Sequence, residues 1–392
     1  MPWSQTSPMD QRTQFIADYL REVQSVSELC DQYGISRKTA YKWIDRYLRQ
    51  GPAGLEERSR KPDTSPHRTP DEIQRALLET RRRHPSWGAK KLLTLLQKRN
   101  PRWALPSRST VCEILSRNGM VAKKPRRRRI GHPGKPGSAI LAANDVWSAD
   151  FKGHFKLGNG QYCYPLTVTD NFSRYLLACQ ALSSTAVAEA KPVFTRLFRE
   201  YGLPQRIRTD NGVPFATNTL ARLSTLSAWW VRLGVMPELI EPGKPQQNGR
   251  HERMHRTLKA ETTRPAAHTG AAQQRKFNVF IDEFNNERPH EALDQHTPAA
   301  WYERSSREMP TKLEPFVYPV RFEVRYVSGN GGIRWNNDWV NVSTVCIGEY
   351  VGLEEIDNGV WNVYFGPLKL GRLDERHMRI EDVYGRLKRH SV

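Results

Sequence analysis

Cysteine is scarce in this sequence, which holds five cysteines among its 392 residues. They are odd in number, widely spread and never in a Cys-x-x-Cys pair, so neither a disulfide framework nor a thiolate zinc site is indicated. No stretch approaches the ~18–20 uncharged apolar residues that a membrane-spanning helix requires. Residues 1–10 also lack the basic-then-apolar order of a secretory signal. We therefore expect a protein that stays in the compartment where it is made.

Acidic residues are few relative to basic ones, with 41 Asp and Glu against 61 Lys and Arg and a net charge of +20. Residues 1–136 hold 29 basic and 13 acidic residues, and the remainder holds 32 and 28. Clustered Lys and Arg gain affinity for a phosphate backbone by releasing condensed counterions. The excess in the first third of the chain favours nucleic acid as a partner, and a solvated basic surface is the alternative.

Residues 1–55 have the pattern of a helix-turn-helix domain. Ser25 and Glu28 have the spacing of a capping box, and a turn at Gly34 follows. Beyond it, apolar residues from Ala40 to Leu48 fall on one stripe of a helix whose outer face is basic. This pattern indicates DNA binding, although many helical hairpins bind nothing. The candidate DNA contacts on the outer face are Arg37, Lys38, Tyr41 and Lys42.

A second helical unit follows a Pro-rich linker over residues 56–68. Thr69 has the character of an N-cap, with Pro70 at the first helical position. The unit spans residues 69–121, with helices expected over 70–83, 88–98 and 107–117. It matches the first unit in size but not in sequence, so we expect tandem helix-turn-helix modules and not a repeat.

Residues 122–143 form a basic connector. Like charges so close together repel one another and favour an extended segment, which could follow a DNA backbone or enter the minor groove. A linker that serves only solubility is the alternative. The candidate DNA contacts in this connector are Lys123, Lys124, Arg126, Arg127, Arg128 and Arg129.

Strand signals begin after residue 144, and the pattern over residues 144–305 is that of an α/β domain. Strands are expected over 146–157, 161–169, 174–182, 206–209 and 236–240, and helices over 185–201, 218–233, 249–261 and 273–286. Three meandering strands followed by alternating helices and strands indicate a mixed sheet covered by helices. Short strands over residues 315–376 suggest a small SH3-like β-barrel.

Three acidic residues are expected at one edge of the mixed sheet. Asp150 lies opposite the apolar face of the first strand, Asp210 ends a short strand, and Glu252 lies in the first turn of a helix. Converging carboxylates repel without a cation, and oxygen ligands with no His or Cys nearby favour Mg²⁺, or Mn²⁺, over Zn²⁺. Glu238 and Glu241 compete for the third position, but one lies in a strand and the other precedes a loop.

The segments around these acids resemble the integrase-type transposases of bacterial insertion sequences, relatives of retroviral integrases with an RNase H-like core and an Asp, Asp, Glu triad. The resemblance covers residues 10 to about 305 well and the C-terminal strands loosely. The 41 residues between Asp210 and Glu252 are somewhat more than the family's usual spacing. The stretches that carry the resemblance are residues 147–153, 209–212, 245–253, 255–259 and 297–302.

The resemblance implies a DDE transposase in which Asp150, Asp210 and Glu252 hold two Mg²⁺ ions, with Mn²⁺ as a possible substitute. It implies binding to double-stranded DNA, both the terminal inverted repeats of an element and its target, by a homo-oligomer of at least two chains. The cytoplasmic nucleoid is the expected location. Two alternatives are a DNA-binding regulator with a non-catalytic RNase H-like core and a nuclease that cuts RNA in hybrids.

The resemblance also implies that basic residues near Glu252 hold the DNA end. Arg256 and Lys259 stand one and two turns beyond Glu252 on the same helix face. A surface pair that only supports the helix is the alternative. Lys244 and Asn248, in the loop before this helix, complete the set of candidate DNA contacts.

Overall fold

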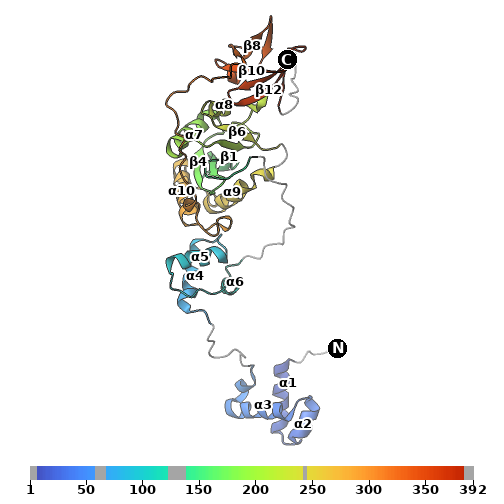
Figure 1. Ribbon diagram of the computed structural model, residues 1–392. Helices are drawn as coiled ribbons and strands as arrows, with labels where there is room; N and C mark the ends of the chain where they lie inside the picture. The colour runs from blue at the N-terminus through green and yellow to red at the C-terminus, as the bar shows by residue number, and fades with distance from the viewer. Residues whose placement is uncertain (1–6, 58–67, 122–137, 242–244, 384–392) are drawn as a thin grey trace. The chain divides into compact units, whose positions relative to one another are not determined.

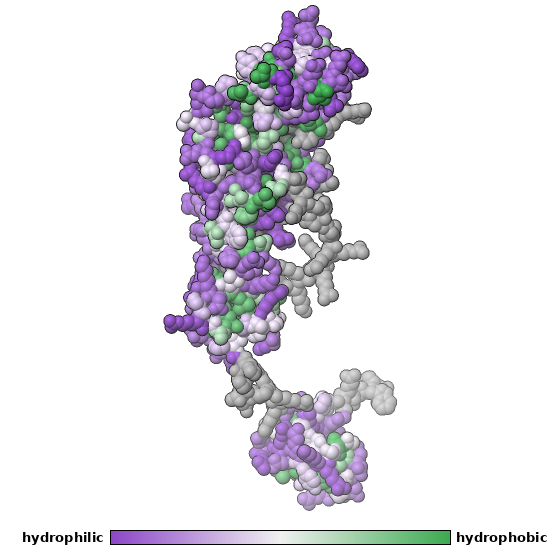
Figure 2. Space-filling view, viewed as in Figure 1, coloured by the Kyte–Doolittle hydropathy of each residue, from purple (hydrophilic) through white to green (hydrophobic). Residues whose placement is uncertain are grey.

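The computed structural model describes residues 7–57, 68–121, 138–241 and 245–383. The basic residues at 123–129 and Lys244, which we predicted as DNA contacts, lie outside these ranges. The chain forms two compact units, Met1–Arg68 and Thr69–Val392. Hydrophilic side chains cover most of the face seen in Figure 2. Within the described ranges, every helix is too short or too polar to cross a membrane.

The first unit is a helix-turn-helix domain. Ser25 and Glu28 form both hydrogen bonds of the predicted capping box, and Gly34, with φ of 62°, ends the second helix. Trp43 is 8% exposed in the core of the unit. Leu48 is 66% exposed, so its predicted place in the buried stripe is wrong. The helices are α1 (Pro8–Leu20), α2 (Val26–Tyr33), α3 (Arg37–Gln50) and the 3₁₀ helix η1 (Gly51–Leu55).

The second unit begins with three helices whose predicted bounds are close to the observed ones. They are α4 (Asp71–Arg83), α5 (Ala89–Arg99) and α6 (Arg108–Arg117). The predicted cap is wrong, because Pro70 occupies the N-cap position of α4 and no side chain caps it. Trp87, Leu77 and Leu92 are fully buried in the shared core of these helices.

The central domain is built on a mixed sheet, as predicted (Figure 1). The strands run in the order β4-β3-β1-β5-β6, and β2 pairs antiparallel with the beginning of β3. β1 pairs antiparallel with β3 and parallel with β5, which is the topology of an RNase H-like core. The strands are β1 (Val146–Phe151), β2 (Phe155–Lys156), β3 (Tyr162–Asp170), β4 (Leu176–Leu182), β5 (Arg206–Thr209) and β6 (Met236–Leu239).

Helices cover both faces of this sheet. On one face Trp147 of β1 packs with Phe194 and Trp230, which lie in α7 (Val187–Tyr201) and α8 (Thr225–Arg232). On the other, Cys163 of β3 packs with Met254 in α9 (Gly249–Thr262) and with α10 (Gly270–Asp282). Successive strand residues alternate between these two layers. The short helices are η3 (Pro245–Asn248), the π-helix η4 (Glu283–Glu287), η5 (Glu291–Leu293), η6 (Pro298–Ala300) and η7 (Thr344–Cys346).

The continuous helix predicted over 218–233 is wrong. A 3₁₀ turn, η2 (Leu220–Arg222), comes first, and Ala221 and Arg222 have φ of 53° and 52°. Positive φ in residues with a Cβ is incompatible with a right-handed helix. α8 begins only after Ser224, which forms a capping box with Ser227.

The C-terminal strands form a five-stranded sheet in the order β13-β12-β11-β10-β7 and a separate β8-β9 hairpin. Closure of these strands into a barrel stays a prediction. The tail after His377, which the sequence pattern left unassigned, contributes β13 to the sheet edge. The strands are β7 (Glu323–Tyr326), β8 (Gly332–Trp335), β9 (Asp338–Asn341), β10 (Tyr350–Asp357), β11 (Val360–Phe365), β12 (Leu368–Asp374) and β13 (Arg379–Asp382).

Candidate active site

Asp150 and Glu252 line one open cavity of about 450 Å³ at the edge of the mixed sheet. Asp150 reaches it because its partner across β1 and β3 is Thr167, and both side chains point toward α9. Glu252 reaches it from the first turn of α9. The cavity is lined by Asp150, Phe151, Lys152, Gly153, Glu252, His255, Arg256 and Lys259.

Asp210 lies just beyond β5, whose parallel pairing with β1 brings the two carboxyl ends to the same sheet edge. The Gly212 backbone N–H donates to Asp210 Oδ1 at 3.1 Å. The side chain of Asn211 donates to the Ile240 carbonyl at 2.8 Å and accepts a hydrogen bond from Arg222 at 3.0 Å. This network fixes the segment that follows β5.

The three predicted acids are close enough to influence one another. Burial, together with the charges of Asp210 and Glu252, raises the pKa of Asp150 to about 7. The Phe151 backbone amide and the Lys152 ammonium oppose this rise. An ionised Asp150 is therefore costly here unless a cation offsets the repulsion. The structure brings the acids together, and their catalytic role stays a prediction.

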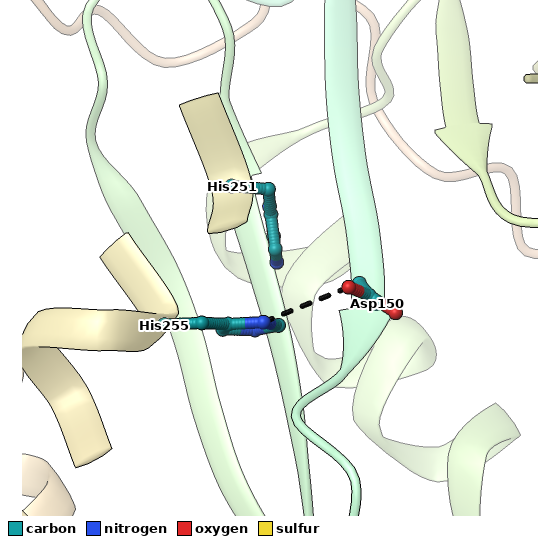
Figure 3. Close-up of side chains that lie close together, drawn as sticks. All are labelled: Asp150, His251 and His255. Carbon is teal, nitrogen blue, oxygen red and sulfur yellow. Dashed lines mark ion pairs between the residues drawn. The ribbon is translucent and has the colours of Figure 1, made fainter. Parts of the chain in front are cut away.

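Two buried histidines stand beside Asp150, so the expectation that no His lies near these acids is wrong (Figure 3). His251 and His255 extend from α9 toward β1, and Nδ1 of His255 lies 3.6 Å from Asp150 Oδ2. Thr167 Oγ1 lies 2.7 Å from Nε2 of His251 and 2.6 Å from Nε2 of His255. The potential ligand atoms of the two histidines and Asp150 lie within 4.8 Å of one another.

Burial disfavours the charged form of both histidines. Burial lowers the pKa of His251 to about 3. Burial also lowers the pKa of His255, and the charges of His251 and Lys152 lower it further. The only sequence signal for this pair is its spacing, because residues 251 and 255 are one helical turn apart and share a face.

The predicted DNA contacts differ in accessibility. Arg256 and Lys259 are exposed and line the cavity. Asn248 is 7% exposed at the N-cap of α9, a placement that suits a structural role more than a DNA contact. Lys152 lines the cavity and was not predicted. In the first unit, the exposed candidates on α3 are Arg37, Lys38, Tyr41 and Lys42.

Family models match both the helical modules and the central domain. Integrase core domain models match residues 141–245 and 233–298. A helix-turn-helix domain model matches residues 11–62, and a homeodomain-like domain model matches residues 39–115. These matches agree with the helix-turn-helix architecture and with the mixed-sheet core.

Two proteins of insertion elements are similar to this chain. An uncharacterized 31.7 kDa protein of insertion element IS407 from Burkholderia multivorans is 25% identical over 269 residues, which cover 65% of this chain and 90% of that protein. An uncharacterized 39.2 kDa protein of IS476 from Xanthomonas euvesicatoria is 26% identical over 246 residues. These residues cover 61% of this chain and 67% of that protein. Among solved structures, the HTLV-2 integrase catalytic core domain in complex with magnesium matches 42% of this chain and 99% of its own, with 15% identity and a TM-score of 0.34.

Proposed function

This chain belongs to the integrase-type transposases of insertion elements, and we propose that it cleaves and joins DNA at the ends of such an element by divalent-metal chemistry at Asp150, Asp210 and Glu252. The helix-turn-helix modules would bind the terminal inverted repeats. At least two chains would act together, because two element ends have to be joined to one target.

One observation carries the proposal, namely the raised pKa of Asp150 in a cavity that it shares with Glu252. A half-buried carboxylate whose pKa is raised by burial and by two neighbouring acids is a poor way to stabilise a fold. Such shifts are typical of sites where carboxylates converge to hold a cation or to act on substrate. The basic residues Arg256 and Lys259 line the same cavity, as a site for a phosphodiester requires.

The donor set fits divalent ions. Carboxylate oxygens of Asp150, Asp210 and Glu252 are hard ligands of the kind that Mg²⁺ and Mn²⁺ prefer. When bound, a pair of such ions supplies Lewis-acid stabilisation to the attacking and leaving oxygens of a phosphodiester. No nucleotide cofactor is required, because each step exchanges one phosphodiester or water oxygen for another.

The chain's own residues orient the DNA. Arg256 and Lys259 would hold phosphates of the element end, and Lys152, which lines the same cavity, would contribute a third positive charge. A water oxygen attacks first and frees a 3′-hydroxyl. That hydroxyl then attacks a phosphodiester of the target DNA and displaces its 3′-oxygen, so one ester bond replaces another.

The test uses the full chain with DNA that ends in the element's terminal repeats. With Mg²⁺ or Mn²⁺ we expect nicking at the repeat ends and joining to a second duplex. Asp150→Asn and Glu252→Gln should each lower the joining rate by at least about a thousandfold while repeat binding is retained, because the carboxylates act on the transition state and not on DNA affinity.

Glu287→Gln is the matched control, since Glu287 is an exposed acid outside the cavity. It should join ends at the wild-type rate. If Glu252→Gln does so as well, the third acid is misassigned. Repeat binding by the wild-type chain without any strand transfer, in either metal, would indicate a DNA-binding regulator with a non-catalytic core.

A further inference from the structure

The hydroxyl of Thr167 contacts both histidines. Its oxygen lies 3.0 Å from the Asp150 carbonyl oxygen and within hydrogen-bond length of Nε2 of both His251 and His255. Nε2 of His255 is thus engaged, and Nδ1 is the imidazole nitrogen that remains for another ligand.

Nδ1 of His255 faces Asp150 Oδ2 at 3.6 Å, beyond hydrogen-bond length (Figure 3). The His255 side chain is 6% exposed and lines the same cavity as Glu252. A nitrogen and a carboxylate oxygen that can both ligate a metal ion therefore face one another, in a group whose potential ligand atoms lie within 4.8 Å of one another.

The separation is close to that of two ligands of one ion. Ligands about 2.1 Å from a common ion lie roughly 3.0–3.4 Å apart at octahedral to tetrahedral angles, slightly less than the 3.6 Å between these two atoms. We propose that Nδ1 of His255 coordinates, together with Asp150, one of the divalent ions of this site. The site would then be a mixed nitrogen and oxygen set, in place of the all-carboxylate set predicted from the sequence. This inference rests on the proposed function and names a ligand that the triad does not include.

His251 has a different role in the same group. Its Nε2 lies 2.7 Å from Thr167 Oγ1, and its Nδ1 lies 3.0 Å from Thr169 Oγ1. Both nitrogens are thus engaged, and the residue is 1% exposed. His251 is a positioning residue that helps to hold Thr167, whose hydroxyl also contacts Nε2 of His255.

A nitrogen ligand changes which metal the site prefers. Imidazole binds Mn²⁺ and later transition ions more readily than Mg²⁺, which favours oxygen. We therefore expect Mn²⁺ to bind this protein more tightly than Mg²⁺. His255→Asn puts an amide oxygen close to the position of Nδ1, so it should lower Mn²⁺ affinity about tenfold or more while Mg²⁺ affinity changes less.

The direct test is pulsed EPR on the full chain loaded with Mn²⁺ alone. Imidazole coordination gives ¹⁴N modulation of the Mn²⁺ echo, which we expect in the wild-type protein. The modulation should disappear in His255→Ala and His255→Asn. It should persist in His154→Ala, the control, because His154 packs on Tyr162 and Tyr164 and does not line the cavity.

Each outcome decides the question. Bound Mn²⁺ without ¹⁴N modulation in the wild-type chain overturns the inference, and this measurement needs no variant to fold. Modulation that survives in both His255 variants overturns it too. The proposed function fails separately: if Asp150→Asn binds Mn²⁺ with wild-type affinity, the triad is not the metal site, whatever the nitrogen signal shows.

Discussion

Asp150 interacts with several neighbouring groups through both its backbone and its carboxylate. Its backbone carbonyl accepts from Thr167, its carboxylate faces His255, and the charges of Asp210 and Glu252 act on it from the cavity. The fold thus concentrates negative charge here, and the Lys152 ammonium offsets it only in part. That arrangement has an energetic consequence for the metal-free protein, and the consequence depends on pH.

We expect Asp150→Asn to stabilise the metal-free protein at pH 8. The pKa of Asp150 rises from 3.8 to about 7 on folding, so the folded state binds more protons than the unfolded state between these values. The contribution of Asp150 to the free energy of unfolding therefore falls as pH rises from about 4, and it levels off above about 7. The difference amounts to about 2–4 kcal/mol at pH 8, which thermal melting in EDTA should register as a rise of a few degrees.

The gain should become small near pH 4, where the wild-type carboxyl is protonated in the folded state and about half protonated in the unfolded state. Glu287→Gln serves as the control and should melt like the wild type at both pH values. A melting temperature of Asp150→Asn that is lower than the wild type at pH 8 would mean that the ionised carboxylate stabilises the fold, contrary to the charge repulsion described above.

The sequence predicted the positions of the acids better than their surroundings. Asp150, Asp210 and Glu252 follow from strand alternation, a strand end and a helix start, all of which are local features. The partnership of His255 with Asp150 depends on Thr167, which reaches both through the register of β3 against β1. The spacing of residues along the chain does not specify that register. The position of the histidines beside Asp150 was therefore not predictable from the sequence.

At the scale of elements, α9 joins the cavity to the second helical module. Its first turn carries Glu252, and near its other end Glu261 accepts hydrogen bonds from Ser86, in the turn between α4 and α5, and from Arg288 at 3.2 Å. The Arg288 side chain is only 9% exposed. His84 and Glu283 make a second contact between the second helical module and the central domain. Nδ1 of His84 lies 2.9 Å from Oε1 of Glu283, which begins η4.

Glu261→Gln should loosen this junction. The amide keeps the size of the carboxylate but leaves the nearly buried Arg288 cation without its partner, which costs about 3 kcal/mol or more. Because the unit has several parts, hydrogen exchange is a better measure than global unfolding. We expect amides of α9 and of the turn at residues 84–88 to exchange at least about tenfold faster.

A matched ion pair controls for charge removal at the same interface. Lys90 and Glu291 are 46% and 73% exposed, so Glu291→Gln should change exchange little, since exposed pairs contribute less than about 1 kcal/mol. Equal acceleration in the two variants would show that burial of Arg288 is not what makes Glu261 important.

Element boundaries were predictable where local chemistry specifies them. The capping box of Ser25 and Glu28 and the N-cap Ser107 mark helix starts within a residue or so of their predicted positions. The break before α8 was not predictable. Positive φ at Ala221 is accompanied by a hydrogen bond from its backbone N–H to Asp382, a residue from the far end of the chain.

At the scale of the molecule, the C-terminal sheet shares a hydrophobic core with the segment that follows Asp210. Leu220, Leu223 and Val231 are buried in one cluster with residues of β8 to β13. Asp382 in β13 accepts from the Ala221 N–H at 3.0 Å. Arg232 in α8 pairs with Glu349 just before β10. η2 and α8, which follow Asp210 in the chain, are thus covered by strands roughly a hundred residues or more away in the sequence.

A chain that ends at residue 314 should therefore lose order around Asp210 although β1, β5 and α9 are all present. Removing the sheet exposes Leu220, Leu223 and Val231 and leaves Arg232 without Glu349, so we expect hydrogen exchange in residues 211–223 to rise about a hundredfold and strand transfer to fall in step. A chain lacking residues 1–68 is the matched control, because those residues form a separate compact unit. It should bind repeat DNA more weakly but show unchanged exchange in 211–223. If the 314-residue chain keeps wild-type exchange there, the C-terminal sheet is an accessory domain, and the order of the Asp210 segment comes from Asn211, Ile240 and Arg222 alone.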